Sequence, residues 1–251
     1  MNDWMINSYF CDGVLNNFNR YPFMRRLFTT AFILMLFCTP IVTYSQGKSP
    51  LKLGLKVAPN LGWMSPSTKG YKSDGAKMGA TIGFISDFYF AENYALSTGF
   101  NFQFINGKLN YFDSLDVNNP NSEIFRKYNF LYLEIPLMIK MKTKPFGKIS
   151  YFGQIGLGTG FRLKATVKDE VTPAIPDMGS PENFNYGTTL IRESVLVGVG
   201  CEYSIDESSR ILIGVSYSNA LNNLFTGINA KSNLDEKSQL NFVELNIGFL
   251  F

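Results

Sequence analysis

The acidic and basic residues that could do chemistry are isolated in the sequence and occur in segments where polar and apolar residues alternate. Those expected to point into a common interior form one set: Asp87, Glu134, Lys140, Arg162, Arg192, Glu202 and Glu244. Convergent carboxylates and cations can form ion pairs, hold a charged solute or act as acid and base. The sequence contains no histidine, which excludes a Ser-His-Asp triad and any metal centre that depends on histidine.

Two further pairs of acids fall in segments expected to be loops, Asp113 with Asp116 and Asp169 with Glu170. Paired carboxylates can support aspartyl or glycosidase chemistry, but loop acids are more simply solvated or in contact with calcium. Cys201 falls on an apolar face and lacks a neighbouring base. We therefore expect no enzymatic activity, no bound metal and no cofactor.

The elements that must position the charged set are eight segments of alternating polarity. They cover residues 51–61, 78–90, 94–105, 128–141, 149–163, 190–205, 210–218 and 239–251. A tilted strand needs about 9–11 residues to cross a bilayer, and the segments reach that length, the seventh marginally. A composition with 17% charged and 15% aromatic residues suits such strands, and the small, scattered net charge of +3 argues against a nucleic-acid partner.

The connections between these segments alternate strictly between short and long. The short ones are residues 91–93, 143–148 and 206–209, and the long ones are residues 62–77, 106–127, 164–189 and 219–238. Outer-membrane barrels have short periplasmic turns and longer external loops. A soluble lipocalin-like barrel is the alternative, but it gives no reason for four long loops on one rim.

The two faces of each segment differ in polarity, because side chains alternate along a strand. In the last segment, Leu245, Ile247, Phe249 and Phe251 share one face with Val243, whereas Glu244, Asn246 and Gly248 share the other. A lipid-facing surface requires every backbone group to be paired within the protein, so the strands must close. We predict an all-β, eight-stranded antiparallel transmembrane β-barrel over residues 46–251, located in the cell outer membrane. Phe249 and Phe251 are predicted to form a C-terminal signal for the barrel assembly machinery.

Residues 1–45 are expected to be a leader. A basic stretch at residues 24–26 precedes an apolar run at residues 27–38, and small residues follow, so we place cleavage after Ser45. We expect Met24 to be the true start and residues 24–45 the signal peptide; an unusually long leader is the alternative. Cleavage leaves Cys201 as a single thiol, so stability must come from barrel closure rather than a disulfide.

Eight strands leave an interior that side chains nearly fill. We predict that Glu134, Glu202 and Glu244 share Arg162, Arg192 and one or more lysines across this lumen, because unpaired buried charges are costly. Such a network would rigidify the barrel; a catalytic or transport site is the alternative. Within the strands, Pro136 predicts a bulge or bend, and the glycines of residues 156–160 make room for bulky neighbours.

Several stretches resemble a known family. They are Y-L-E-I-P-L-M-I-K at residues 132–140, G-Q-I-G-L-G-T-G at 153–160, V-G-V-G-C-E-Y at 197–203 and the aromatic end. Together they resemble the PorT-like outer-membrane β-barrel family of Bacteroidota, over nearly the whole mature chain. The resemblance implies an outer-membrane barrel. The family's founding member assists type IX protein secretion, but that role does not follow for every member, and no site residues carry over.

Our main functional hypothesis is a non-enzymatic integral barrel with a filled polar lumen. Its external loops would contact a ligand, a surface partner or lipopolysaccharide, with Phe112, Phe125, Phe184 and Tyr186 as rim anchors or as part of the interface girdle. The alternative is an accessory component of type IX secretion that docks other subunits. A narrow channel is a third possibility.

Overall fold

The computed structural model describes residues 51–68, 70–113, 122–172, 182–183, 187–206, 208–226 and 237–251. Residues 1–45, predicted to be the leader, lie outside these ranges, as do Phe184 and Tyr186. No helix within the ranges is long and apolar enough to cross a membrane.

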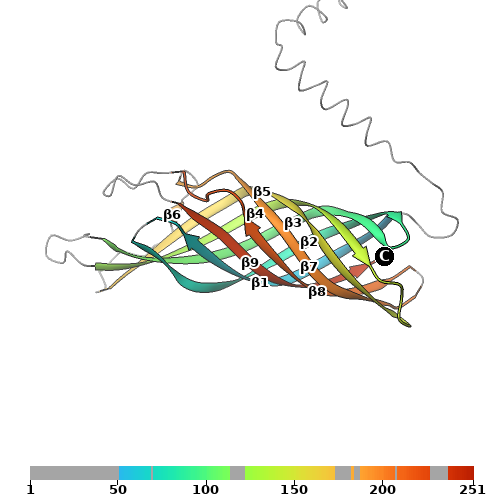
Figure 1. The fold of residues 1–251 in the computed structure, drawn as a ribbon. Helices are drawn as coiled ribbons and strands as arrows, with labels where there is room; N and C mark the ends of the chain where they lie inside the picture. Colours follow the sequence, from blue (N-terminus) through green and yellow to red (C-terminus); the bar gives the residue numbers. More distant parts are fainter. Residues whose placement is uncertain are drawn as a thin grey trace, which may run out of the picture. The chain divides into compact units, whose positions relative to one another are not determined.

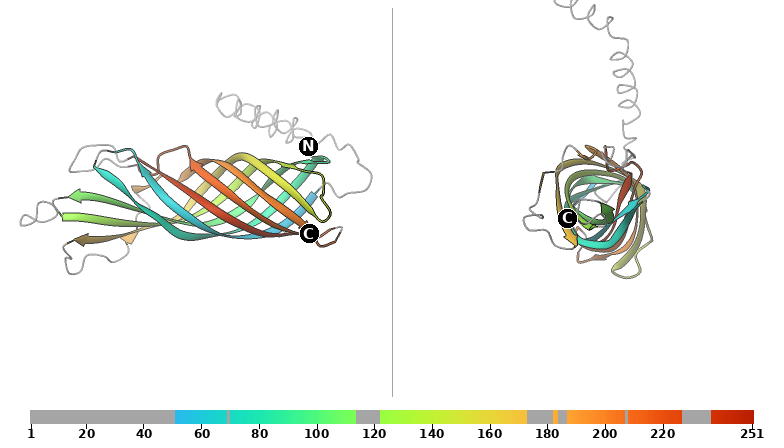
Figure 2. Two further views of the ribbon diagram at one scale, coloured as in Figure 1. Left: turned by 60° about the horizontal axis from the view of Figure 1, so that its bottom comes forward. Right: turned by 90° about the vertical axis from the view of Figure 1, so that its left-hand side faces the viewer.

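Nine β-strands run through the described residues, and eight of them are long (Figure 1). Their bounds are β1 Leu51–Pro66, β2 Tyr71–Ala91, β3 Tyr94–Asp113, β4 Ser122–Lys142, β5 Ile149–Thr172, β6 Glu182–Asn183, β7 Ile191–Ser204, β8 Arg210–Ala220 and β9 Ser238–Leu250. The long strands pair antiparallel in the order β1–β2–β3–β4–β5–β7–β8–β9, and β9 returns to β1. Figure 2 (right) shows the closed ring along its axis. The predicted eight-stranded antiparallel barrel is confirmed.

Side chains alternate between the outside of this ring and its lumen. In β9, Leu245, Ile247 and Phe249 are exposed, whereas Glu244 and Asn246 are buried. The exposed apolar side chains of the outer face form what we call the apolar belt: Leu55, Val57, Ile82, Phe102, Phe104, Ile135, Leu137, Ile139, Ile155, Leu157, Leu163, Val197, Val199, Ile213, Val215, Leu245, Ile247 and Phe249. Exposure on this scale is unfavourable in water and suits contact with acyl chains.

The predicted short turns lie together at one end of the barrel, with the C-terminus. They join β2 to β3, β4 to β5 and β7 to β8. In the last of them, Asp206 Oδ1 accepts the backbone N–H groups of Ser209 and Ser208 at 2.6 and 2.9 Å, and these bonds hold the pKa of the Asp206 carboxyl below its usual range. We call this end the short-turn end.

Five strands extend well beyond the predicted segments, which corrects the expected loops at the opposite end. β1 continues to Pro66, β2 begins at Tyr71, β3 continues to Asp113, β4 begins at Ser122 and β5 continues to Thr172. The connections expected at residues 62–77, 106–127 and 164–189 therefore contain long stretches of paired strand. In Figure 2 (left), the green β3 and β4 project well beyond the ends of β1 and β9. We call this part, residues 71–77, 106–113, 122–129 and 164–172, the head.

The head reverses the polarity of the two faces. On β3, the outward Phe104 is exposed and apolar, but the next outward residues are Asn106, Lys108 and Asn110. The inward residues of the same stretch are buried and apolar: Ile105, Leu109 and Tyr111. The apolar belt therefore ends where the head begins, and the head has an outer face suited to water.

An apolar cluster fills the lumen where it meets the head. It consists of Met64, Ile105, Leu109, Tyr128, Phe130, Tyr132, Ala165, Val167, Leu224, Phe225, Leu240 and Phe242. The Tyr128 ring lies 6.0 Å from that of Phe130 and 5.4 Å from that of Phe225, between centroids. Each large apolar side chain buried here contributes about 1.5–3 kcal/mol to stability. The prediction of a polar lumen is therefore incomplete, because this level of the lumen is apolar.

Pro136, predicted to cause a bulge or bend, causes no bulge in the β4–β5 pair, but the β3–β4 pairing is interrupted opposite it, between Thr98–Leu137 and Asn101–Glu134. The β4–β5 register runs unbroken through Pro136, which faces Gly158, and the irregularity lies instead between Leu131 and Tyr132. On the other side, the Thr98 hydroxyl donates to the Pro136 carbonyl at 2.8 Å, and the next residue, Gly99, has φ +145°. The neighbouring strand β3 thus adapts to the proline.

Gly156 makes a close backbone approach that a side chain would block. A Cβ there would lie 2.1 Å from the Leu137 carbonyl oxygen and 2.6 Å from Met138 Cα, whereas a Cβ on Gly153 of the same strand would meet nothing within 4 Å. Replacing Gly156 with alanine should therefore lower the free energy of unfolding by about 1–3 kcal/mol. Urea titration of the detergent-refolded barrel measures this, with Gly153→Ala as the matched control. Equal stability of the two variants would contradict the β4–β5 packing.

Candidate functional site

Glu202 on β7 is the centre of a first charged cluster, at the short-turn end of the lumen. Lys140 Nζ lies 2.6 Å from Glu202 Oε1 and 2.7 Å from Asp87 Oδ2, so it links β4 to both β7 and β2. Arg210 Nη1 lies 3.1 Å from Glu202 Oε2, and Lys142 Nζ contacts the same oxygen. Three cations thus surround two buried carboxylates.

A second cluster lies on β1, β8 and β9. Lys56 Nζ is 2.9 Å from Glu244 Oε1 and donates to Asn246 Oδ1 at 3.1 Å. The Ser216 hydroxyl donates to the same Glu244 oxygen at 3.0 Å and accepts a hydrogen bond from Asn246 Nδ2 at 2.7 Å. This cluster pairs one cation with one carboxylate, and neutral side chains add hydrogen bonds to Lys56 Nζ and to Glu244 Oε1.

A third cluster joins Glu134 on β4 to Arg192 on β7. The two side chains approach to 3.6 Å, and Glu134 Oε1 accepts hydrogen bonds from Gln103 Nε2 at 2.8 Å and Asn101 Nδ2 at 3.2 Å. Arg192 Nη2 donates to the Leu240 carbonyl at 2.9 Å, and its guanidinium carbon lies 5.1 Å from the centre of the Phe242 ring. Arg192 therefore ties the polar lumen to the apolar cluster above it.

Glycines on the inner face make these contacts across strands possible. Gly160 on β5 is the register partner of both Glu134 and Arg192, so the two side chains meet over a residue without a side chain. A Cβ on Gly158 would lie 2.9 Å from Glu134 Oε2, and one on Gly83 would lie 2.1 Å from Asn101 Oδ1. The glycine-rich stretch at residues 156–160 therefore gives room to charged side chains as well as to bulky ones.

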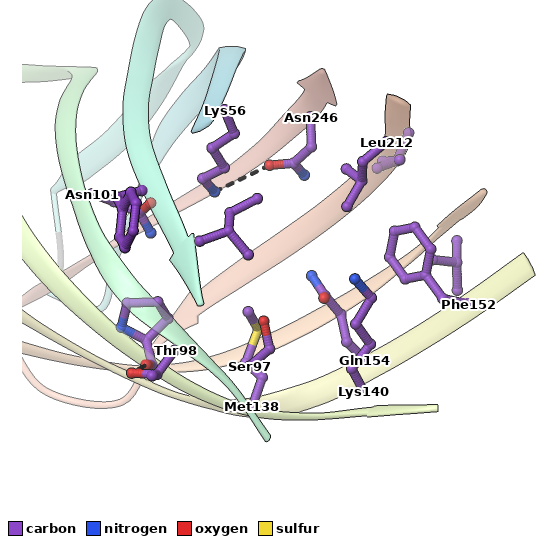
Figure 3. Close-up of a pocket in the computed structure, with 16 residues that line it drawn as sticks. Lys56, Ser97, Thr98, Asn101, Met138, Lys140, Phe152, Gln154, Leu212 and Asn246 are labelled. Carbon is purple, nitrogen blue, oxygen red and sulfur yellow. Dashed lines mark hydrogen bonds between the residues drawn. The ribbon is translucent and has the colours of Figure 1, made fainter. Parts of the chain in front are cut away.

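A cavity of about 40 Å³ separates the first and second clusters (Figure 3). Figure 3 shows Lys56 and Asn246 across this cavity from Lys140 and Gln154. One water needs about 10–15 Å³ of such volume, so the cavity can hold a few waters. Among its described lining residues, the charged ones are Lys56 and Lys140, and each is already bound to a carboxylate. The cavity is too small for a solute larger than a few waters.

Arg162 differs from its expected role. Its guanidinium donates to the carbonyl and the hydroxyl oxygen of Thr188 instead of to a lumen carboxylate. One of its expected partners, Glu134, already binds Arg192, Gln103 and Asn101. Arg162 instead fixes the segment before β7, where Thr189 N donates to the Leu224 carbonyl at 2.8 Å, and so holds Leu224 in the apolar cluster.

Lys142 and Arg210 belong to the first cluster, although neither was predicted there. The strand expected at residues 128–141 ends one residue before Lys142. Inward positions recur every second residue, so the alternation that places Lys140 inward also predicts an inward position for Lys142. Arg210 begins the predicted seventh strand and shares the inward face with Leu212 and Ser216. The same period of two could therefore have assigned Arg210 to the lumen.

A model of the family described as outer membrane protein beta-barrel domain matches residues 44–226, most of the chain. The chain belongs to this family. Membership in the outer membrane protein beta-barrel domain family, together with the closed ring and the apolar belt, establishes an integral protein of the outer membrane.

Solved structures of other outer-membrane proteins are similar to this member of the family. Neisserial surface protein A is 10% identical, over 82% of this chain and 98% of its own, with a TM-score of 0.46. Ail of Yersinia pestis is 14% identical over 81% and 100%, with a TM-score of 0.36. The protease OmpT of Escherichia coli is 11% identical over 83% and 99%, with a TM-score of 0.37. No curated protein matches the chain. At these scores the similarities carry no argument about function.

Removing the Glu202 carboxylate should leave three lumen cations with Asp87 as the one remaining carboxylate of the first cluster. Glu202→Gln is therefore expected to lower the free energy of unfolding by about 3–5 kcal/mol. Adding Lys142→Met to that variant should restore part of the loss, because it removes one of the uncompensated charges. Urea unfolding in detergent micelles measures all three proteins.

The matched control is Glu193→Gln on the same strand, where the carboxylate accepts a hydrogen bond from the Thr159 hydroxyl at 3.0 Å outside the lumen. Its effect should stay within about 0.5 kcal/mol. If the Glu202 and Glu193 variants unfold alike, the lumen clusters do not hold the barrel together.

Proposed function

We propose that this chain is a non-enzymatic outer-membrane protein that acts through its head, in envelope structure or in binding. The observation that carries the proposal is the projection of β2–β5 beyond the apolar belt, with a polar outer face and an apolar interior. Long connections of outer-membrane barrels face the cell exterior, so we infer that the head lies outside the cell. There it meets lipopolysaccharide and molecules at the surface.

The contacts within the head support a binding role. Its inner face holds the buried Tyr111 and Ile124 against Tyr71, and Arg126 Nε donates to Asp169 Oδ1 at 2.6 Å across the β4–β5 pair. Burial is the largest single effect and opposes the charge of Arg126, but the hydrogen bond with Asp169 and the electrostatic interactions with Tyr128, Tyr111 and Asp169 together outweigh it and raise the pKa of Arg126. A surface fixed in this way loses little conformational entropy when a ligand binds.

The chemistry of the lumen supports the non-enzymatic part of the proposal. The carboxylates Asp87, Glu134, Glu202 and Glu244 each face a cation within the barrel. The sequence also lacks histidine, the usual acid–base group at neutral pH. A network of this kind serves as a rigid plug, and we infer that it carries neither catalysis nor transport.

The alternative is a PorT-like accessory component of type IX protein secretion. It is favoured by the resemblance of residues 132–140 and 197–203 to that family of Bacteroidota. In this case the head or the short turns would dock other subunits of the secretion system.

We also propose that Phe249 and Phe251 are read by the barrel assembly machinery. Both rings point outward at the end of the last strand, where Phe251 N donates to the Leu53 carbonyl at 2.8 Å and closes the ring. Outward rings at this position are accessible before the strands β1 and β9 have paired.

Gene deletion and complementation distinguish the two functions. We expect a deletion strain to show altered surface binding or a more permeable envelope, with normal bulk protein export. A truncated chain, in which a short turn replaces residues 107–128, should fail to correct that defect. The truncated chain should still reach the outer membrane and show heat-modifiable gel migration, because the pairing of Asn106 with Asn129 and of Ile105 with Phe130 is retained.

Two results would overturn the main proposal. Full complementation by the truncated chain would remove the head from the function. Loss of bulk export in the deletion strain would establish the secretion alternative. A double substitution in a short turn, Lys144→Gln with Lys148→Gln, is the control and should complement fully under the main proposal.

A further inference from the structure

The outer face of β7 carries a carboxylate that does not belong to the lumen clusters. Glu193 lies two residues after the start of β7 and is partly exposed, whereas its neighbours Arg192 and Ser194 are buried in the lumen. Its Oε2 accepts a hydrogen bond from the hydroxyl of Thr159 on β5 at 3.0 Å. Among the described residues, its other carboxylate oxygen forms no hydrogen bond or ion pair. Glu193 therefore presents a free acceptor on the outer wall of the barrel.

Exposed apolar side chains surround this carboxylate on three strands. Ile191 and Val197 are exposed on either side of it along β7, and Phe161 and Leu157 are exposed on either side of its register partner on β5. Leu221, whose backbone N–H donates to the glutamate carbonyl at 2.8 Å, is exposed just beyond β8. The surface that suits acyl chains thus continues past the carboxylate. An ionisable side chain at membrane depth is costly and marks a functional site.

An amide side chain lies beside this carboxylate. Asn219 on β8 is the register partner of Val195, so it is a diagonal neighbour of Glu193, and diagonal neighbours lie about 7–8 Å apart. The Asn219 side chain is partly exposed and forms no hydrogen bond within the described part of the chain. A carboxylate oxygen and an amide thus leave room between them for a group that can both donate and accept a hydrogen bond.

The level of this pair in the membrane restricts what can bind it. Both residues lie near the ends of β7 and β8 that are opposite the short-turn end. Because we place the head outside the cell, these ends lie in the outer leaflet, where acyl chains join their headgroups. Ester linkages present carbonyl oxygens there, which cannot donate to a carboxylate. An amide linkage presents an N–H donor as well as a carbonyl.

We propose that the outer wall of β7 and β8 binds an outer-leaflet lipid whose acyl chain is attached through an amide. The lipid N–H donates to Glu193, the amide carbonyl accepts from Asn219, and the acyl chains lie on the apolar belt. A hydrogen bond to a charged acceptor is stronger than one between neutral groups, so Glu193 provides the selectivity. Lipid A and ceramide lipids share this chemistry. The site is separate from the head and depends on the proposed function only for the choice of leaflet.

The test compares two lipids with the same headgroup, ceramide phosphoethanolamine and diacyl phosphatidylethanolamine. The purified full-length protein in detergent micelles is titrated with each lipid and followed by native mass spectrometry. The wild type should bind the amide-linked lipid about 10-fold more tightly than the ester-linked one, a factor at the low end for one hydrogen bond to a charged group.

Three variants assign this preference to single side chains. Glu193→Leu removes the acceptor and should bind the two lipids alike. Asn219→Leu should bind both lipids about 3-fold more weakly and keep the preference, because an ester carbonyl also accepts a hydrogen bond from the asparagine. Glu92→Leu removes a carboxylate from the turn between β2 and β3 and, as the matched control, should bind like the wild type.

The wild-type comparison decides the matter even if a variant misfolds. Equal binding of the two lipids by the wild type would overturn the inference, and so would an undiminished preference in a Glu193→Leu protein that keeps heat-modifiable gel migration. A change in oligomeric mass in Glu193→Leu, with the lipid preference unchanged, would identify a second copy of the chain as the occupant and would also overturn it.

Competition distinguishes the two sources of the amide. Lipid A that displaces the ceramide lipid from the wild type would identify the glycolipid as the ligand, and a failure to displace it would identify the ceramide class. These results are independent of the complementation experiment. A head that is required in cells would leave the proposed function intact even if the protein does not distinguish the two lipids.

Discussion

The rest of the structure depends on one constraint, the pairing of backbone groups in hydrocarbon. An unpaired N–H or carbonyl within a bilayer costs several kcal/mol, so an open sheet edge is not tolerated there. Pairing of β1 with β9, from Gly54 with Leu250 to Pro66 with Ser238, removes both edges at once. Closure fixes which side chains face lipid and which face the lumen, and every other feature of the site follows from that division.

Closure also encloses polar side chains in a narrow lumen, where the charged clusters pair them. Eight strands leave a narrow interior, and long polar side chains fill it only if their neighbours are small. Glycines at positions such as Gly83, Gly158 and Gly160 provide that space, and Lys140, Arg192 and Lys56 reach carboxylates on other strands across it. The lumen is therefore held by the three charged clusters and by the apolar cluster where it meets the head.

The strands within the membrane could be predicted from sequence because their polarity has a period of two throughout. The assignment of Glu134, Arg192, Glu202 and Glu244 to the lumen needed no more than this period. The head was missed because the polarity reverses: outward positions are apolar up to Phe104 and polar from Asn106, while the inward positions become apolar at Ile105. If one face of a strand is expected to be apolar throughout, the strand is predicted to end where the polarity reverses, and the residues beyond are assigned to a loop. The role of Arg162 could not be predicted, because its partner Thr188 comes from a separate segment whose position depends on the whole fold.

The position of the membrane edge tests this account most directly. Spin labels attached singly to β3 at Phe102, Phe104, Lys108 and Asn110, in a Cys201→Ser background and in liposomes, report contact with lipid or with water. We predict that labels at 102 and 104 collide mainly with oxygen dissolved in the bilayer, and that labels at 108 and 110 collide mainly with a water-soluble nickel chelate. Lipid contact at 108 and 110, or water contact at 102 and 104, would contradict both the apolar belt and the head.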